Sequence, residues 1–190
     1  VKGGTGKILE YFGEGARALS ATGKGTVTNM GAEIGATTST FGYDDQMDPY
    51  LRATNRGPIA DLCKQYGPHL QSDPEAEKDP EKFYDEYYEI DLDKLEPHIV
   101  GPHTPDLGRS ISAMSTEVDE KKYPAEISAA LIGSCTNSSY EDMTRSVSLV
   151  RQAKDAGIKV KTNFLVTPGS EQIYETIKRD GILGEFEEVG

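Results

Sequence analysis

The chain has 190 residues, of which 36% are hydrophobic and 27% charged, and its formal net charge is −12. This composition is typical of a soluble globular protein, and the acidic balance argues against a nucleic-acid surface, because phosphates require a concentrated basic face. No apolar run approaches the roughly 18 residues of a membrane span and the N-terminus lacks a signal-peptide pattern, so we expect a soluble chain that is not exported.

The N-terminal half contains a run of small residues over positions 26–39. Within this run Asn29 and Glu33 are four positions apart, so on a helix they would share a face. A carboxylate beside a carboxamide can orient a water molecule or accept a proton, whereas the alternative is a polar pair that faces solvent. The glycine-rich residues 3–7 lack the GxxxxGK[ST] pattern, and a nucleotide site is therefore not supported.

The middle of the chain predicts a surface loop, then a strand, then a linker. Residues 72–84 are acidic and carry two prolines, a composition typical of a solvated loop. Residues 87–92 alternate apolar and acidic side chains, which is the period-two pattern of a half-buried strand. A segment rich in proline and glycine follows, so we place a domain boundary near Pro97, between residues 1–96 and 97–190.

The C-terminal half alternates strands with helices, which predicts an α/β fold with a parallel sheet and helical crossovers. The expected elements are a strand over residues 129–132, a helix over 138–156, a strand over 159–166 and a helix over 170–179. Each strand leads at its carboxyl end into a helix, and ligands of open α/β sheets bind at such ends. For the turn over residues 167–171, a structural loop with a capping serine is the alternative.

Cys135 follows the apolar run at residues 129–132, where a helix is expected to begin. Ser138 and Glu141 match a capping box, which predicts the start of the helix, and Gly157 is suited to end it. A helix N-terminus stabilises a thiolate over a thiol, so Cys135 is a candidate nucleophile or metal ligand. The alternative is a small, buried, apolar cysteine.

The other cysteine and the histidines belong to no recognisable motif. Cys63 lies in an apolar helical stretch and is interpreted as a core residue. It has no CxxC spacing to Cys135, which argues against a disulfide framework and a complete zinc site in this chain. His98 and His103 lie in the proline-rich segment without HxH or HxxxH pairing, so we interpret each as structural or exposed.

Taken together, several segments resemble the aconitases, within the wider group of iron–sulfur hydro-lyases. These segments are residues 29–39, 101–107, 132–142 and 167–173, and they follow the family's order and spacing. The similarity runs from end to end and is most like the mitochondrial-type branch. It implies parts of two aconitase-type α/β domains with mixed or parallel sheets flanked by helices. Homoaconitase and isopropylmalate isomerase share parts of the cysteine segment, so a related hydro-lyase remains an alternative.

The resemblance also implies a reaction and its site. Aconitases interconvert citrate and isocitrate through cis-aconitate at a 4Fe–4S cluster, where one iron acts as a Lewis acid. Cys135 matches the first of three cluster ligands, and the family's other two form a later CGPC pair. Asn29 and Glu33 match active-site positions, at which the carboxylate helps to orient polar groups around the iron-bound hydroxyl.

The chain also departs from the whole-family pattern. It lacks the CGPC pair, the segments with the family's catalytic His and Asp residues, and the swivelling domain with its serine and arginines. We therefore expect an internal part of an aconitase that needs the remaining domains. One thiolate cannot hold a cluster that normally needs three, so the chain alone is expected to be inactive.

Location and function class stay open at this point. The resemblance fits either the mitochondrial matrix or the bacterial cytoplasm. Besides a hydro-lyase, the sequence permits a noncatalytic interaction module with the aconitase fold. It also permits a thiol enzyme in which Cys135 is the nucleophile, although no histidine is placed by any motif to serve as its base.

Overall fold

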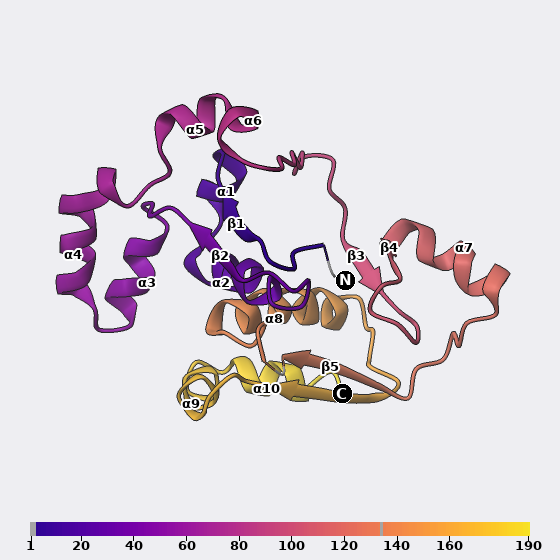
Figure 1. The fold of residues 1–190 in the computed structure, drawn as a ribbon. Coiled ribbons are helices and arrows are strands. Elements are labelled where there is room, and N and C mark those ends of the chain that lie inside the picture. The colour runs from indigo at the N-terminus through magenta and orange to yellow at the C-terminus, as the bar shows by residue number, and fades with distance from the viewer. Residues whose placement is uncertain (1–2, 134) are drawn as a thin grey trace. The chain divides into compact units, whose positions relative to one another are not determined.

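The computed structural model describes residues 3–133 and 135–190, and it divides them between two compact units, one up to Thr116 and the other Glu117–Gly190 (Figure 1). Helices are combined with small parallel and antiparallel sheets, which confirms the predicted α/β class. No helix in the described part of the chain is both long and apolar enough to cross a membrane. The predicted boundary near Pro97 falls inside the first unit and stays a prediction.

The first unit is built from short elements. In chain order they are β1 (Ile8–Tyr11), α1 (Glu14–Ala18), α2 (Ala21–Met30), β2 (Thr38–Phe41), α3 (Met47–Ala53), α4 (Gly57–Tyr66), the 3-10 turn η1 (Gly67–His69), α5 (Pro74–Lys78), α6 (Pro80–Phe83), β3 (His98–Val100), β4 (Gly108–Ser110) and α7 (Ile111–Lys121), which continues into the second unit. Strands β1 and β2 pair in parallel, whereas β3 and β4 form an antiparallel pair.

Three expectations for the middle of the chain are wrong. Residues 72–84 contain the short helices α5 and α6, because a proline at the first helical position is preset for a helix and lacks only an N–H that would be unpaired anyway. Residues 87–92 are irregular and exposed, since their apolar alternation has no strand beside it among the described residues. The proline-rich segment after Pro97 is an antiparallel strand pair, not a linker.

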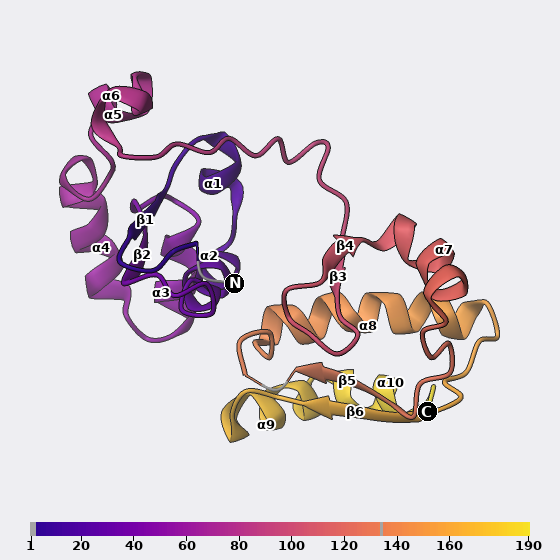
Figure 2. The same ribbon diagram turned by 45° about the vertical axis from the view of Figure 1, so that its right-hand side comes forward.

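The second unit contains the expected alternation of strands and helices. Strand β5 (Ala129–Gly133) pairs in parallel with β6 (Asn163–Thr167), and helices α8 (Tyr140–Asp155), α9 (Glu171–Arg179) and α10 (Ile182–Glu187) pack with them (Figure 2). The two predicted strands and the predicted helices α8 and α9 are confirmed, although β6 begins at Asn163 rather than at residue 159. Helix α10 is an element that the sequence did not predict.

The core of the second unit lies between these helices and one face of the β5–β6 pair. Met143, Val147 and Val150 recur along α8 at helical spacing and are buried. They form one cluster with Ile177, Ile182, Phe186 and Val189, against which Ile132, Phe164 and Val166 of the strands pack. Burial of this apolar surface holds the two strands in a fixed position relative to α8.

Helix α8 begins at Tyr140, two residues after the predicted start, and its N-cap lies one residue after the predicted one. Its N-cap is Ser139, whose hydroxyl accepts a hydrogen bond from the backbone N–H of Asp142, and the Asp142 carboxylate accepts in return from the N–H of Ser139. The predicted capping box of Ser138 and Glu141 is therefore wrong by one position. At the other end Gly157 is left-handed, with φ of 69°, which confirms its predicted role.

Candidate functional site

The carboxyl ends of β5 and β6 meet at one edge of the second unit. The strand register pairs Gly133 with Thr167, so the loops that leave the two strands start side by side. Gly133 has φ of 104°, and a Cβ atom there would lie 2.1 Å from the Thr167 carbonyl oxygen. Only glycine fits this close approach, so the two loops can start this near to each other because residue 133 is a glycine.

Cys135 lies on the loop that follows β5, and it is exposed. The alternative of a buried, apolar cysteine is therefore wrong. The expected position at the helix N-terminus is also wrong, because Cys135 precedes the N-cap Ser139 by four residues and lies outside the first turn of α8. The structure thus presents an accessible thiol at the strand edge without placing it among the N–H groups of the helix.

Ser138 anchors this loop through hydrogen bonds to Cys135 and Gly169. Its side chain is buried, with 2% exposure, and its hydroxyl donates a hydrogen bond to the Cys135 carbonyl oxygen at 2.7 Å. The Ser138 carbonyl oxygen accepts a hydrogen bond from the Gly169 N–H at 2.9 Å. Sequence reasoning missed this role, because it assigned Ser138 to the cap of α8 and had no means of placing Gly169 beside it.

The loop after β6 completes the edge. Ser170 caps α9 by accepting a hydrogen bond from the Ile173 N–H at 3.2 Å, which confirms the capping serine expected in residues 167–171. A Cβ atom on Gly169 would lie 3.0 Å from the Ser138 hydroxyl oxygen and 3.1 Å from its carbonyl oxygen. The two loops therefore approach each other closely at Gly169.

Asn29 and Glu33 belong to the first unit, and both are exposed. Asn29 lies near the end of α2, which stops at Met30, and Glu33 lies in the following turn. The expected shared helical face is therefore wrong. The chain turns here because Gly31 allows β2 to approach, since a Cβ atom at Gly31 would lie 2.2 Å from the Ser39 hydroxyl oxygen.

Cys63 lies on helix α4, as predicted, but it is only half-buried. Its neighbours Ile59 and Leu62 are 48% and 49% exposed, so the interpretation of Cys63 as a core residue is wrong. His98 and His103 are exposed, in agreement with one of the two interpretations given for them.

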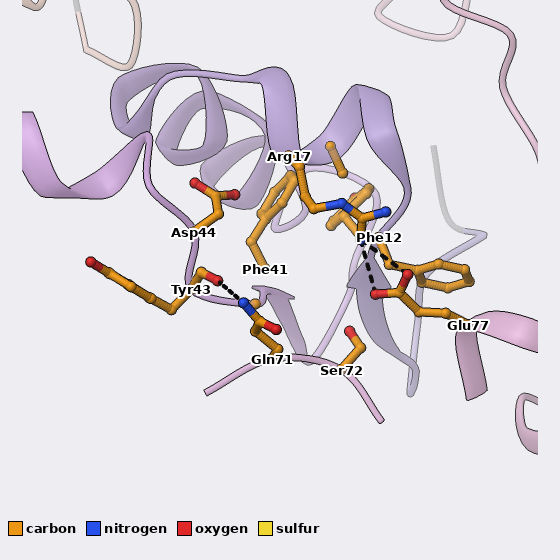
Figure 3. Close-up of a pocket in the computed structure, with 11 residues that line it drawn as sticks. Phe12, Arg17, Phe41, Tyr43, Asp44, Gln71, Ser72 and Glu77 are labelled. Carbon is orange, nitrogen blue, oxygen red and sulfur yellow. Dashed lines mark hydrogen bonds and ion pairs between the residues drawn. The ribbon is translucent and has the colours of Figure 1, made fainter. Parts of the chain in front are cut away.

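A small pocket lies in the first unit among residues of β1, α1, β2 and the segment before α5 (Figure 3). It encloses about 50 Å³, far less than the several hundred Å³ of a typical ligand site. Its charged groups are already paired: Arg17 donates to Glu77 at 3.0 and 3.1 Å, and Asp44 lies 2.7 Å from the Lys24 ammonium. The charged side chains of this pocket are therefore held by ion pairs within the first unit.

Comparison with known proteins determines the family of the chain. The aconitase family (aconitate hydratase) matches residues 1–190. The chain belongs to the aconitase family. Relatives include the mitochondrial aconitate hydratases of Saccharomyces cerevisiae and Gracilaria gracilis, which are 57% and 55% identical over all 190 residues, and a probable one of Dictyostelium discoideum at 52%. The chain spans only 24% of the length of each of these relatives.

Membership of the aconitase family implies an iron–sulfur cluster, and the residues of this chain fit part of such a site. Cys135 offers an exposed thiol at a strand edge, which is the soft donor that iron–sulfur clusters require. Within residues 3–133 and 135–190, no group of three or more His, Cys, Asp or Glu side chains is arranged to hold a metal. These residues therefore form no complete metal site by themselves.

Proposed function

We propose that this chain is part of an aconitate hydratase, which interconverts citrate and isocitrate through cis-aconitate, and that Cys135 is one ligand of its 4Fe–4S cluster. The observation that carries this proposal is the exposed Cys135 thiol at the carboxyl edge of β5 and β6, in a chain that matches the aconitase family along its whole length. The relatives' names favour aconitate hydratase over homoaconitase or isopropylmalate isomerase.

The roles of the chain's own residues follow from their chemistry. When bound, the cluster supplies a Lewis acid that makes hydroxide a better leaving group. Cys135 holds the cluster through one thiolate, and the other cysteine ligands come from outside the 190 residues. Asn29 and Glu33 orient polar groups near the substrate through their exposed amide and carboxylate.

The remaining aconitase domains complete this site and bind the substrate. The 190 residues alone are therefore inactive in this proposal, because one thiolate does not retain a cluster that needs three. Several relatives carry the word mitochondrial in their names, which supports the mitochondrial matrix as the location, and the bacterial cytoplasm remains the second candidate.

The test compares cluster binding by the chain and by a complete enzyme. Residues 1–190 replace the matching 24% of the S. cerevisiae aconitate hydratase, and iron, sulfide and the visible spectrum are measured after anaerobic reconstitution. We expect the chimera to hold a 4Fe–4S cluster and the isolated chain to hold none. Cys135→Ser abolishes the 4Fe–4S cluster of the chimera, whereas Cys63→Ser, the matched control, leaves it intact.

The same chimera tests Asn29 and Glu33. Glu33→Gln and Asn29→Ala retain the cluster but lower kcat at least tenfold, because they remove groups that orient the reacting hydroxyl. A chimera that keeps a full 4Fe–4S cluster after Cys135→Ser would overturn the assignment of the ligand. Full activity of the Glu33→Gln chimera would overturn the role of the carboxylate.

A further inference from the structure

Ser138 connects the loop after β5 to the loop after β6. Its hydroxyl donates to the Cys135 carbonyl oxygen at 2.7 Å, and its own carbonyl oxygen accepts from the Gly169 N–H at 2.9 Å. The side chain is 2% exposed, one of few polar side chains in the described residues that are buried so fully. Burying a hydroxyl costs free energy unless a hydrogen bond compensates, so a buried serine indicates that its hydrogen bond has a role that an apolar side chain could not fill.

The start of helix α8 does not explain this hydroxyl. Ser139 and Asp142 form the capping box by themselves, and Ser138 contributes no hydrogen bond to the first turn. The Ser138 hydroxyl instead donates backwards along the chain, to the carbonyl oxygen of Cys135. The hydrogen-bond partner of the Ser138 hydroxyl is thus the backbone of the residue that carries the thiol.

Gly169 fixes the position of Ser138 from the opposite loop. The glycine lies so close that a Cβ atom would be 3.0 Å from the Ser138 hydroxyl oxygen. Such a contact leaves no room for a side chain at residue 169 unless Ser138 moves. The path from Gly169 through Ser138 to Cys135 therefore links the thiol-bearing loop to the capped start of α9.

We infer that Ser138, held by Gly169, is a positioning residue that fixes the Cys135 backbone so that its thiolate meets the cluster in one orientation. This inference rests on the proposed function, in which Cys135 is a cluster ligand. A ligand on an exposed loop loses conformational freedom when it binds, and a loop that is already ordered loses less. Hydrogen bonds around a ligand commonly set its orientation and affinity in this way.

The first test uses the 190-residue chain without a cluster. Amide hydrogen exchange is followed by NMR in the wild type and in Ser138→Ala, which removes the donor to Cys135. The variant keeps the Ser138 carbonyl that accepts from the Gly169 N–H, but it loses the hydroxyl's hydrogen bond that holds the Ser138 backbone to Cys135. We therefore expect the Gly169 amide to exchange about tenfold faster, the factor that corresponds to the ordinary net strength of the lost bond. Amides in the core part of α9, such as that of Ile177, keep their rates.

Two further variants separate positioning from general destabilisation. Ser139→Ala is the matched control, because it weakens the neighbouring cap of α8 but leaves the contact to Cys135 intact, and it should not change the Gly169 exchange rate. Gly169→Ala disturbs Ser138 from the other side and should accelerate exchange at Ser138 and Cys135. Equal exchange at Gly169 in wild type and Ser138→Ala would overturn the inference.

The second test uses the chimera with its cluster. Ser138→Ala should release iron several-fold faster than the wild type during chelation and change the EPR spectrum of the reduced cluster, whereas Ser139→Ala should change neither. If the Cys135→Ser chimera keeps its cluster, the proposed function fails while the exchange result for Gly169 still stands. If Cys135→Ser loses the cluster but Ser138→Ala changes neither iron release nor EPR spectrum, only the positioning role is overturned.

Discussion

Glu10 on β1 accepts hydrogen bonds from two residues that lie far along the chain. Its carboxylate binds the hydroxyl of Ser72 and, at 2.9 Å, the hydroxyl of Tyr84. Burial of the Tyr84 side chain, together with this hydrogen bond, raises the pKa of Tyr84 to about 12. The acidic segment that contains α5 and α6 is therefore tied to the β1–β2 pair by specific polar contacts.

The raised pKa of Tyr84 predicts a loss of stability at alkaline pH. The neutral phenol is favoured in the folded chain. The stability that Tyr84 contributes is therefore complete below the ordinary tyrosine pKa of 10.0 and is lost as pH rises from 10.0 towards about 12. Denaturant unfolding of wild type and Tyr84→Phe should show a stability difference that shrinks over this range. If the stability difference between wild type and Tyr84→Phe stays constant from about pH 8 to about pH 12, that result would contradict the raised pKa of Tyr84.

At the scale of elements, the start of helix α8 offers two adjacent capping boxes in the sequence, Ser138 with Glu141 and Ser139 with Asp142, and the structure contains the second. Ser139 and Asp142 exchange hydrogen bonds across the first turn, whereas Glu141 forms an exposed ion pair with Arg145 at 2.6 Å. Ser139→Ala should lower the free energy of unfolding by about 1 kcal/mol. Glu141→Ala should lower it by less than about 0.5 kcal/mol, since an exposed i,i+4 pair contributes little. Equal losses in the two variants, measured by urea unfolding, would favour the other capping pattern.

Elements whose cause is local could be predicted from the sequence. Helix α8, the left-handed Gly157 and the capping serine of α9 depend on residues a few positions apart, and their existence was predicted correctly. Residues 87–92 were predicted wrongly, because alternation makes a strand only when another strand lies beside it. The end of α2 before Glu33 depends on the close approach of β2 at Gly31, which no local pattern reveals.

The candidate site was predictable to the same extent. Cys135 was found because an apolar run ends just before it, and the exposure of its thiol agrees with a role as ligand. The function of Ser138 was not predictable, because its partner Gly169 is distant in sequence and is brought near only by the pairing of β5 with β6. The sequence shows that Ser138 is present, but only the folded structure shows that it contacts Gly169.

At the scale of the whole molecule, the second unit leaves one face of its sheet uncovered. Ile132, Phe164 and Val166 point into the core, and the alternate residues Leu131 and Leu165 face the other way. These two leucines are direct cross-strand partners and are 53% and 54% exposed. Parallel strands are ordinarily buried on both faces, so this apolar face is poorly suited to contact with water.

The uncovered face predicts self-association of the isolated chain. At high concentration the wild type should sediment as species heavier than a monomer and bind an apolar dye, because association removes the paired leucines from water. The double variant Leu131→Ser/Leu165→Ser should remain monomeric with little dye fluorescence. Leu149→Ser, at a single leucine of α8 that is 67% exposed, is the matched control and should associate like the wild type. A strictly monomeric wild type without dye binding would show that this face is stable in water, and equal effects of both variants would show that association does not depend on the sheet.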